Sequence, residues 1–245
     1  MEQGAATRAD GASAETAGSV ALDVTAALDL EQHGAALHRG AALSILPALD
    51  AIAAGQPAQR AGIRLRDIPA LSELLVAGPV HTVAAHYLGP DVRPARAILF
   101  DKTAQANWSL GWHQDRTVAV VARCNLPGFG PWTTKQGILH VAPPFAVIER
   151  MVTLRIHLDD VPIDNAPLLI APGSHRLGRV PEETVERAVR RCGVFACVAR
   201  RGDIWAYATP ILHASGAARG DRRRRVLQID YAADALPGGL EWLGV

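Results

Sequence analysis

A histidine and an aspartate two residues apart are the first candidates for chemistry in this sequence. They lie in the segment Gly-Trp-His-Gln-Asp at positions 111–115. Because successive side chains of an extended segment point to opposite faces, His113 and Asp115 would project from the same face and could hold one metal ion together. Two imidazoles and one carboxylate on one face, with the other positions open, are the ligands of a non-haem iron(II) oxygenase. The pair therefore indicates a metal site that needs one more histidine.

The third ligand is not fixed by this pair alone, and His/Asp pairs on surface loops often bind nothing. The chain has nine histidines, of which five fall in the part where we expect strands. The four in the expected helical part are His33, His38, His81 and His86, and the other five are His113, His140, His157, His175 and His213. Only the context of each histidine can choose among them.

One of these histidines is followed by a basic residue at an informative spacing. His213 ends an apolar segment, and Arg224 opens an apolar run eleven residues later, after a turn rich in Gly, Ala and Asp. An antiparallel return across that turn would bring Arg224 beside His213, where its planar guanidinium could bind the distal end of a dicarboxylate through paired hydrogen bonds. The register stays open, because Arg222 to Arg225 are consecutive and Arg222 shares a face with Arg224. The run could instead be a solvated basic strand edge.

The elements that must position these residues change in character along the chain. Residues 1–20 are rich in Ala, Gly, Ser and Thr, and we expect a disordered tail there, followed by a single domain over residues 21–245. Residues 22–89 show a helical pattern. Helix starts are expected near Asp29, Ser44 and Asp67, with Asp29 capping a helix that runs to Leu37, and helix ends are expected at Gly55, Gly78 and Gly89.

Residues 93–232 change to the period of strands, with short apolar runs separated by Pro, Gly and Asp. The expected strands are 95–102, 117–122, 151–159, 168–171, 194–198, 203–208, 211–214 and 224–231. Helices that precede strands, without a βαβ alternation, indicate an α+β fold that is mainly β. We therefore predict a two-sheet jelly roll with the N-terminal helices packed on one sheet.

Composition excludes several classes of partner. The formal net charge of +1 gives no field that would attract nucleic acid or an anionic membrane. No apolar run approaches the roughly eighteen residues of a membrane span, and the first residues lack the apolar core of a signal peptide. Three cysteines without a C-x-x-C spacing indicate reduced thiols. We expect a cytoplasmic protein whose partner is a small molecule, and the oligomeric state stays open.

Several motifs, taken together, resemble the phytanoyl-CoA dioxygenase family of 2-oxoglutarate oxygenases over about residues 95–232. They are Ala-Ile-Leu-Phe-Asp-Lys at 97–102, Trp-His-Gln-Asp at 112–115, Leu-Arg-Ile-His-Leu-Asp at 154–159, Pro-Gly-Ser-His-Arg at 172–176 and His-Ala-Ser-Gly at 213–216. The resemblance implies a double-stranded β-helix of cupin-like form, with iron(II) held by His113, Asp115 and His213. It also implies 2-oxoglutarate and O₂ as co-substrates, with Arg224 binding the 2-oxoglutarate carboxylate and Ser215 supporting it.

The family pattern is broken at one position. In Asn-Ala-Pro-Leu at 165–168, Ala166 stands where the family usually has Gly. We expect this departure to affect a turn and to leave the site untouched.

Further polar residues are candidate contacts of the co-substrate or substrate. Lys102 ends a strand that should line the cavity, where it could reach the co-substrate or face solvent. Arg155 and His157 alternate along one strand and so share a face, where they could meet a polar substrate or hydrogen-bond inside the fold. The long stretch 123–149, with several Pro and Gly, is expected to be a lid. Its candidate substrate contacts are Trp132, Lys135 and His140.

The activity that the resemblance implies is hydroxylation of an aliphatic C–H bond with release of succinate and CO₂. Asp115 keeps the carboxylate ligand that halogenating relatives replace with a small residue, while desaturation or cyclisation stays open. One alternative is a non-catalytic cupin-like metal-binding or sensor protein, which would not need Arg224 and Ser215. Another is zinc hydrolysis at the same three ligands. The near-neutral charge indicates no basic groove for the phosphates of an acyl-CoA.

Overall fold

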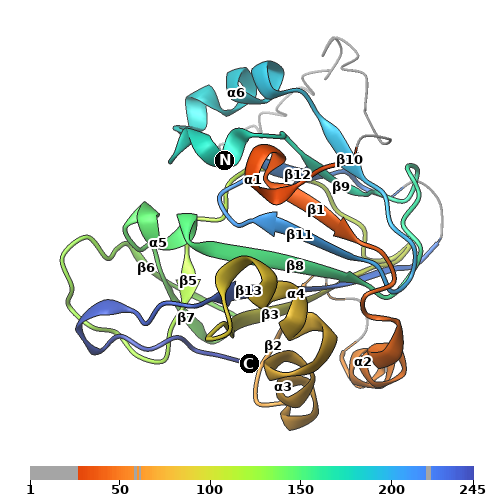
Figure 1. Ribbon diagram of the computed structural model, residues 1–245, viewed down its shortest axis with the longest axis horizontal. Coiled ribbons are helices and arrows are strands. Elements are labelled where there is room, and N and C mark those ends of the chain that lie inside the picture. Colours follow the sequence, from red (N-terminus) through yellow and green to blue (C-terminus); the bar gives the residue numbers. More distant parts are fainter. Residues whose placement is uncertain (1–26, 58–59, 61, 219–221) are drawn as a thin grey trace, which may run out of the picture.

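Two antiparallel sheets form the centre of the molecule, and a small third sheet extends from one end (Figure 1). The computed structural model describes residues 27–57, 60, 62–218 and 222–245. The expected tail at residues 1–20 lies outside the described residues. The major sheet has the order β1 (Ala35–His38), β11 (Ile204–Ala208), β8 (Met151–His157), β13 (Arg224–Ala232), β3 (Arg93–Lys102) and β2 (Ile63–Leu65).

The minor sheet lies across from the major sheet, so that one face of each points inward. Its order is β10 (Phe195–Cys197), β9 (Leu168–Ile170), β12 (His213–Ser215) and β4 (Leu110–His113). The third sheet has the order β5 (Val118–Ala119), β7 (Ile138–Val141) and β6 (Trp132–Lys135). The predicted mainly β jelly roll is confirmed, with open sheets and no closed barrel.

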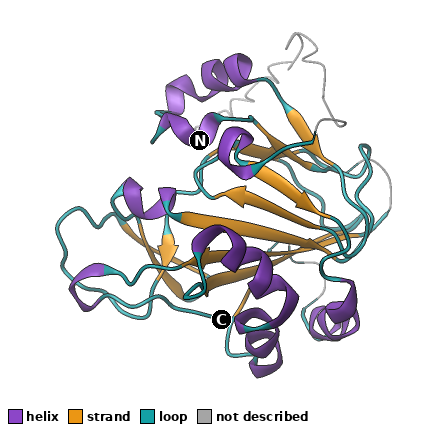
Figure 2. Cartoon of the chain, viewed as in Figure 1, coloured by secondary structure: helices purple, strands orange, loops and turns teal. Residues whose placement is uncertain are grey.

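The helices cover outer faces of the sheets (Figure 2). Helices α2 (Leu46–Ala54), α3 (Pro69–Val76) and α4 (Gly78–Leu88) each carry a proline in the first turn, where its missing N–H costs nothing. Their buried side chains pack in one cluster with the outward side chains of β8 and β13, as predicted for the N-terminal helices. On the other side, α6 (Val185–Cys192) packs near β4. The remaining elements are α1 (Leu30–His33), α5 (Phe145–Glu149), η1 (Leu43–Ile45), η2 (Ser174–Leu177), η3 (Glu182–Thr184) and η4 (Pro237–Gly239).

Burial on both faces of β8 sets up an interior for chemistry. Leu154 and Ile156 point outward into the helix-covered core and are fully buried. The alternate residues Thr153, Arg155 and His157 point to the inner face and are also buried. A strand that alternates apolar and polar residues and is buried on both sides must therefore find partners for its polar side chains within the space between the sheets.

Some expected boundaries in the helical part are wrong. Asp29 caps α1 by accepting a hydrogen bond from the Gln32 amide at 2.7 Å, but Gly34, at φ 79°, ends the helix at His33. The chain to Leu37 forms strand β1 instead, because Gly34 adopts a left-handed conformation that a helix cannot continue through.

Two other helix boundaries also differ from the expectation. Gly78 begins α4 instead of ending a helix. The cap position of α3 is Ile68, so Asp67 does not cap it.

The segment expected to be an irregular lid, residues 123–149, is partly regular. It contains the hairpin β6–β7 and helix α5. The turn of the hairpin is Gln136-Gly137, with φ of 52° and 77°, the positive values that a tight type I′ turn requires. The Gln136 side chain donates to the Gly62 carbonyl at 2.7 Å and accepts from the Arg64 amide at 3.2 Å. The hairpin is thus fastened to the edge strand β2.

Among the described residues, no helix is long and apolar enough to cross a membrane.

Candidate metal centre

Three side chains from two neighbouring strands converge at one point. His113 ends β4, Asp115 follows it, and His213 begins β12, directly opposite His113 in the strand pairing. The ligating atoms of the three residues all lie within 4.8 Å of one another, and the imidazole centroids are 4.2 Å apart. Among the described residues, they are the one group of three or more potential ligands that gathers in this way.

Both histidines are held in the form that binds a metal. The carbonyl of Gly111 lies 2.7 Å from Nδ1 of His113, and the carbonyl of Ile211 lies 3.0 Å from Nδ1 of His213. Because a carbonyl only accepts, each Nδ1 carries the proton and leaves the Nε2 lone pair for a metal. Burial lowers the pKa of His213 to about 4, with repulsion from His113 in the same direction, so its imidazole is neutral.

Asp115 supplies a charge that a cation would satisfy. Its Oδ2 is buried and has no hydrogen-bond partner among the described residues, although Arg96 Nη2 lies 3.7 Å away. Burial acts to raise the pKa of Asp115, but nearby positive charge, that of Arg96 first, outweighs it and the pKa is lowered overall. A buried carboxylate oxygen without a partner costs free energy. Two imidazoles with Nε2 free to bind, beside a buried carboxylate, therefore fit a divalent transition metal.

Gln114, which lies between the candidate ligands His113 and Asp115, fixes their orientation. Gln114 points to the opposite face, where its amide donates to the carbonyls of Gly178 at 3.0 Å and Pro210 at 2.7 Å. Its side-chain oxygen accepts from the Val180 amide at 2.9 Å. Both N–H donors of the amide and one of the two lone pairs of its oxygen are thus used. The segment 113–115 is therefore anchored to two loops.

A buried ion pair lies behind Asp115. Arg96, on β3, contacts Asp230, on β13, at 2.5 and 2.6 Å, and Thr153 donates to the same carboxylate at 3.1 Å. Sequence reasoning missed this pair. Parity places Arg96 on the same face of its strand as Lys102, and Asp230 on the same face as Arg224, but it does not give the pairing of the two strands.

A second cluster of polar residues lies in the same cavity, which has a volume of about 400 Å³. Lys102 and Arg224 are opposite each other in the β3–β13 pairing and are 1% and 2% exposed. Ser215 Oγ lies 3.2 Å from Lys102 Nζ and 3.4 Å from an Arg224 nitrogen. Lys102 also donates to two backbone carbonyls, and neither cation has a carboxylate partner among the described residues.

Burial changes the proton affinity of both cations. Burial, together with the charges of Arg224 and Arg155, lowers the pKa of Lys102 to about 7. Burial likewise lowers the pKa of Arg224 to about 9, helped by repulsion from Arg155. Two buried cations side by side are costly, and a bound anion would offset that cost.

The register of the arginine run is resolved by alternation. Arg223 and Arg225 point outward and pair with Asp101 at 2.7 Å and Asp159 at 2.6 Å, whereas Arg224 points into the cavity. Arg222 pairs with Asp164 at 2.5 Å.

The expected antiparallel return from His213 to Arg224 is wrong. β12 belongs to the minor sheet and β13 to the major sheet, so the chain crosses between the sheets. Arg224 and Ser215 therefore approach each other across the cavity from facing sheets.

The departure at Ala166 does reach the site. Ala166 adopts φ 50°, a left-handed conformation that glycine takes without strain, which explains why glycine is usual there. Its carbonyl accepts a hydrogen bond from Arg224. The expectation that this turn leaves the site untouched is therefore wrong.

The remaining candidate contacts divide into two groups. Arg155 and Lys135 line the cavity that holds the metal-binding group. His140 and His157 are buried, at 0% and 2% exposure, but are not among the residues that line the cavity, and Trp132 packs in an apolar cluster with residues of β5 and β7. The structure does not bring these three to the cavity.

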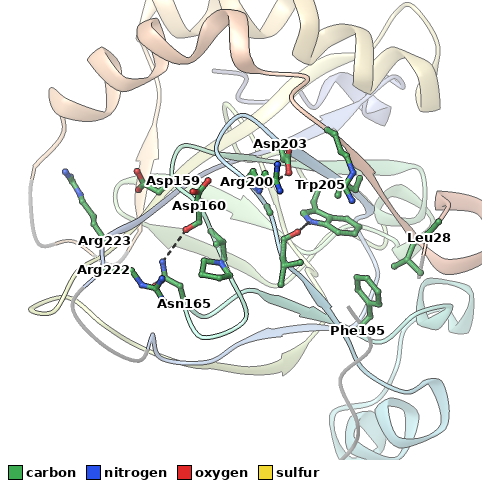
Figure 3. Close-up of a pocket in the computed structure, with 17 residues that line it drawn as sticks. Leu28, Asp159, Asp160, Asn165, Phe195, Arg200, Asp203, Trp205, Arg222 and Arg223 are labelled. Carbon is green, nitrogen blue, oxygen red and sulfur yellow. Dashed lines mark hydrogen bonds between the residues drawn. The ribbon is translucent and has the colours of Figure 1, made fainter. Parts of the chain in front are cut away.

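A larger hollow, of about 840 Å³, lies elsewhere and lacks the metal-binding group (Figure 3). Leu28 and Phe195 lie at one end of it and Arg222 and Arg223 at the other, with Trp205 between them beside Arg200 and Asp203. Its polar groups bond mainly to the protein, as when Trp205 Nε1 donates to the Val198 carbonyl at 3.0 Å and Asn165 donates to the Asp160 carbonyl at 3.4 Å. Its polar groups therefore give little reason to place the chemistry there.

Comparisons with known proteins agree with this geometry. The sequence model of the phytanoyl-CoA dioxygenase (PhyH) family matches residues 30–226, which is most of the chain. A search of curated proteins finds no match.

Solved structures with the same fold are distant in sequence. EvdMO1 is 21% identical with a TM-score of 0.56 over 85% of this chain, which spans only 49% of EvdMO1. EctD from S. alaskensis, solved with bound Fe, is 18% identical with a TM-score of 0.59 over 83% of this chain and 74% of its own. HygX from Streptomyces hygroscopicus, solved with nickel and 2-oxoglutarate, is 16% identical with a TM-score of 0.55 over 83% and 84%. At these identities the likeness shows the fold.

The converging triad predicts the effect of removing a ligand. We expect His113→Ala, Asp115→Asn and His213→Ala each to weaken binding of iron(II) or its substitute cobalt(II) by about two orders of magnitude or more, beyond the roughly 10–100-fold typical of residues behind the ligands. Anaerobic titration calorimetry measures this, with circular dichroism to verify the fold. His86→Ala removes an exposed histidine and is the control. Unchanged affinity in any of the three variants would contradict the assignment.

Proposed function

Because this chain belongs to the phytanoyl-CoA dioxygenase family, we propose that it hydroxylates an aliphatic C–H bond of a small molecule and releases succinate and CO₂. It is a 2-oxoglutarate-dependent non-haem iron enzyme, with iron(II), 2-oxoglutarate and O₂ as cofactor and co-substrates, as the motifs predicted. The observation that carries the proposal is that one cavity contains both the His/Asp/His group and two buried cations, Lys102 and Arg224, that have no carboxylate partner among the described residues.

His113, Asp115 and His213 are proposed to hold the iron. When bound, iron(II) supplies the redox chemistry that couples oxidation of 2-oxoglutarate to oxidation of the substrate. The three side chains line the cavity, so a metal that they held would be accessible to a co-substrate and a substrate there. Retention of Asp115 as a ligand favours hydroxylation over halogenation, because its carboxylate fills the position that a halide would need.

Arg224, Lys102 and Ser215 are proposed to bind the distal carboxylate of 2-oxoglutarate. The guanidinium of Arg224 can donate two parallel bonds to a carboxylate, while the Ala166 carbonyl and Ser215 fix its plane. Lys102 is oriented by the carbonyls of Trp108 and Gly216, at 2.8 and 2.6 Å. These contacts orient the co-substrate so that its keto acid end faces the His/Asp/His group.

A metal-binding or sensor protein without turnover would use the same three ligands. It would have no need of two cations buried at 1% and 2% exposure, which destabilise the folded protein unless an anion binds. The buried pair therefore favours the enzyme.

Turnover without the true substrate tests the function. We expect the protein with iron(II), 2-oxoglutarate and ascorbate to form succinate slowly in the presence of O₂, because the proposed metal ligands and the proposed co-substrate cations line one cavity. Zinc should inhibit, since it occupies the same ligands without redox chemistry. Succinate is measured by chromatography, with a screen of small molecules to find those that accelerate it. Tight metal binding with no succinate under any condition would favour the sensor.

Arg224 should control affinity for 2-oxoglutarate without affecting the metal. We expect Arg224→Ala to raise the 2-oxoglutarate requirement by roughly two or more orders of magnitude, each 1.4 kcal/mol being about tenfold. Arg224→Lys should recover only part of the loss, because an ammonium cannot form two parallel bonds. Iron binding should survive in both variants. The matched controls are Arg223→Ala and Arg225→Ala, which remove outward arginines of the same strand, and a larger defect in either would contradict the register.

Lys102 should make 2-oxoglutarate binding depend on pH. Its pKa in the free site is lowered to about 7, and a bound carboxylate favours the protonated form and so raises that pKa. Below about pH 7 the ammonium is already present, whereas above it binding must take up a proton, so affinity should fall by up to about tenfold per pH unit. Titrations between about pH 6 and pH 9 measure this. Lys102→Met should bind more weakly at low pH and lose this part of the slope, and an equal slope in both proteins would refute the role.

A further inference from the structure

The cavity carries far more positive charge than the proposed iron and co-substrate contacts use. Seven cationic side chains line it, and Asp115 is the one carboxylate among its described lining residues. Buried charges are normally paired, because an unpaired charge loses its hydration without compensation. Each of the seven cations is therefore expected to have a partner in the protein or to bind an anionic ligand.

Five of the seven already have partners or a proposed role. Arg96 is paired with Asp230, and Arg116 is paired with Glu182 at 3.0 Å at the cavity mouth. Lys102 and Arg224 are assigned to 2-oxoglutarate. Arg155 lies over the ring of Phe100, at 5.2 Å from its centroid. The two that remain are Arg64 and Lys135.

Arg64 and Lys135 are brought together by the fastening of the hairpin to β2. Arg64 is the central residue of β2, and Lys135 ends β6, next to the Gln136 side chain that bonds to the backbone of Arg64. The Arg64 Nε is buried and has no partner among the described residues. Lys135 Nζ has one contact, with Thr117 Oγ1 at 3.2 Å. Neither forms an ion pair within the part of the chain that the structure describes.

This pair lies beside the metal centre and apart from the co-substrate cations. The charges of Arg96, Arg64 and Asp115 act on Lys135, whereas those of Arg224 and Arg155 act on Lys102. Arg64 is opposite Ile98 on β3, and Lys102 is four residues further along that strand. Four residues of extended chain separate Cα atoms by roughly 14 Å. Arg64 and Lys102 therefore project from well-separated positions along the length of β3.

We propose that Arg64 and Lys135 form an anion subsite for the primary substrate, which carries a carboxylate or phosphate group. The inference rests on the proposed function, because it takes the iron and 2-oxoglutarate positions as filled. The anion would hold one end of the substrate next to Asp115, and Ile98 and Phe100, which line the same cavity, would contact an apolar body. The substrate is thus an acidic molecule with an aliphatic part, and a neutral or cationic molecule of equal size is excluded by the unpaired charge.

The test compares two probes that differ in charge alone. Hexanoate and hexanamide are titrated by anaerobic calorimetry into the protein loaded with iron(II) and saturating 2-oxoglutarate, so that the co-substrate cations are occupied. We expect hexanoate to bind about tenfold or more tightly than hexanamide. Inorganic phosphate is titrated in the same way, and whichever anion binds more tightly identifies the group that the subsite prefers.

Variants locate the binding. Arg64→Gln and Lys135→Gln should each weaken anion binding about tenfold and leave hexanamide and 2-oxoglutarate affinity unchanged. Arg64→Lys should retain much of the anion affinity, which guards against misfolding as the cause. Arg66→Gln, an exposed arginine just beyond β2, is the matched control and should have no effect.

The outcomes separate this inference from the function on which it rests. Failure of both anions to bind, equal binding of hexanoate and hexanamide, or full anion affinity in both Gln variants overturns the subsite. Loss of 2-oxoglutarate affinity in those variants also overturns it, because the cations would then serve the co-substrate. Absence of 2-oxoglutarate binding or succinate in the unmodified protein instead overturns the proposed function.

Discussion

Positive charge buried on the inner face of the major sheet is the constraint on which the site depends. Helices α2 to α4 cover the outer face with an apolar core, so every second residue of β3, β8 and β13 must point into the space between the sheets. Among those residues are Lys102, Arg155 and Arg224, and none has a carboxylate partner in the described chain. Their burial lowers the free energy of unfolding until an anion binds, so the anion-binding cavity is formed at a cost in stability.

The minor sheet contributes the opposite requirement. It presents two imidazoles and an Asp115 oxygen that has no hydrogen-bond partner among the described residues, and together these donors favour a cation. Backbone carbonyls fix the tautomers, and Gln114 fixes the backbone, so the donors are oriented before any metal arrives. The major sheet favours an anion and the facing minor sheet favours a cation. A metal ion chelated by an anion supplies both charges, and this is the combination that the family uses.

The sequence predicted the parts of the site that local rules determine. Two-residue alternation places His113 and Asp115 on one face and separates Arg224 from its neighbours, and motif spacing selects His213. Contacts between distant strands were out of reach: the Arg96–Asp230 pair depends on the β3–β13 register, and Arg64 depends on a three-residue edge strand too short to show a period. The crossing from β12 to β13 was misjudged because a turn of this length allows either a hairpin or a change of sheet. The hairpin at Gln136 was missed because its turn lacks the Asn or Asp that usually marks it.

Net charge is a poor guide to the substrate of such a fold, because the two faces of one strand are balanced separately. At the start of β13 the outward arginines, Arg223 and Arg225, pair with Asp101 and Asp159, while inward Arg224 pairs with no acid among the described residues. The acids that bring the whole chain to +1 are thus used largely outside the cavity. The total charge gives no sign of a basic groove, whereas seven cations and one carboxylate line the cavity among the described residues. The charge of the ligand is indicated by the residues that line the cavity and not by the whole chain, and this lining is strongly basic.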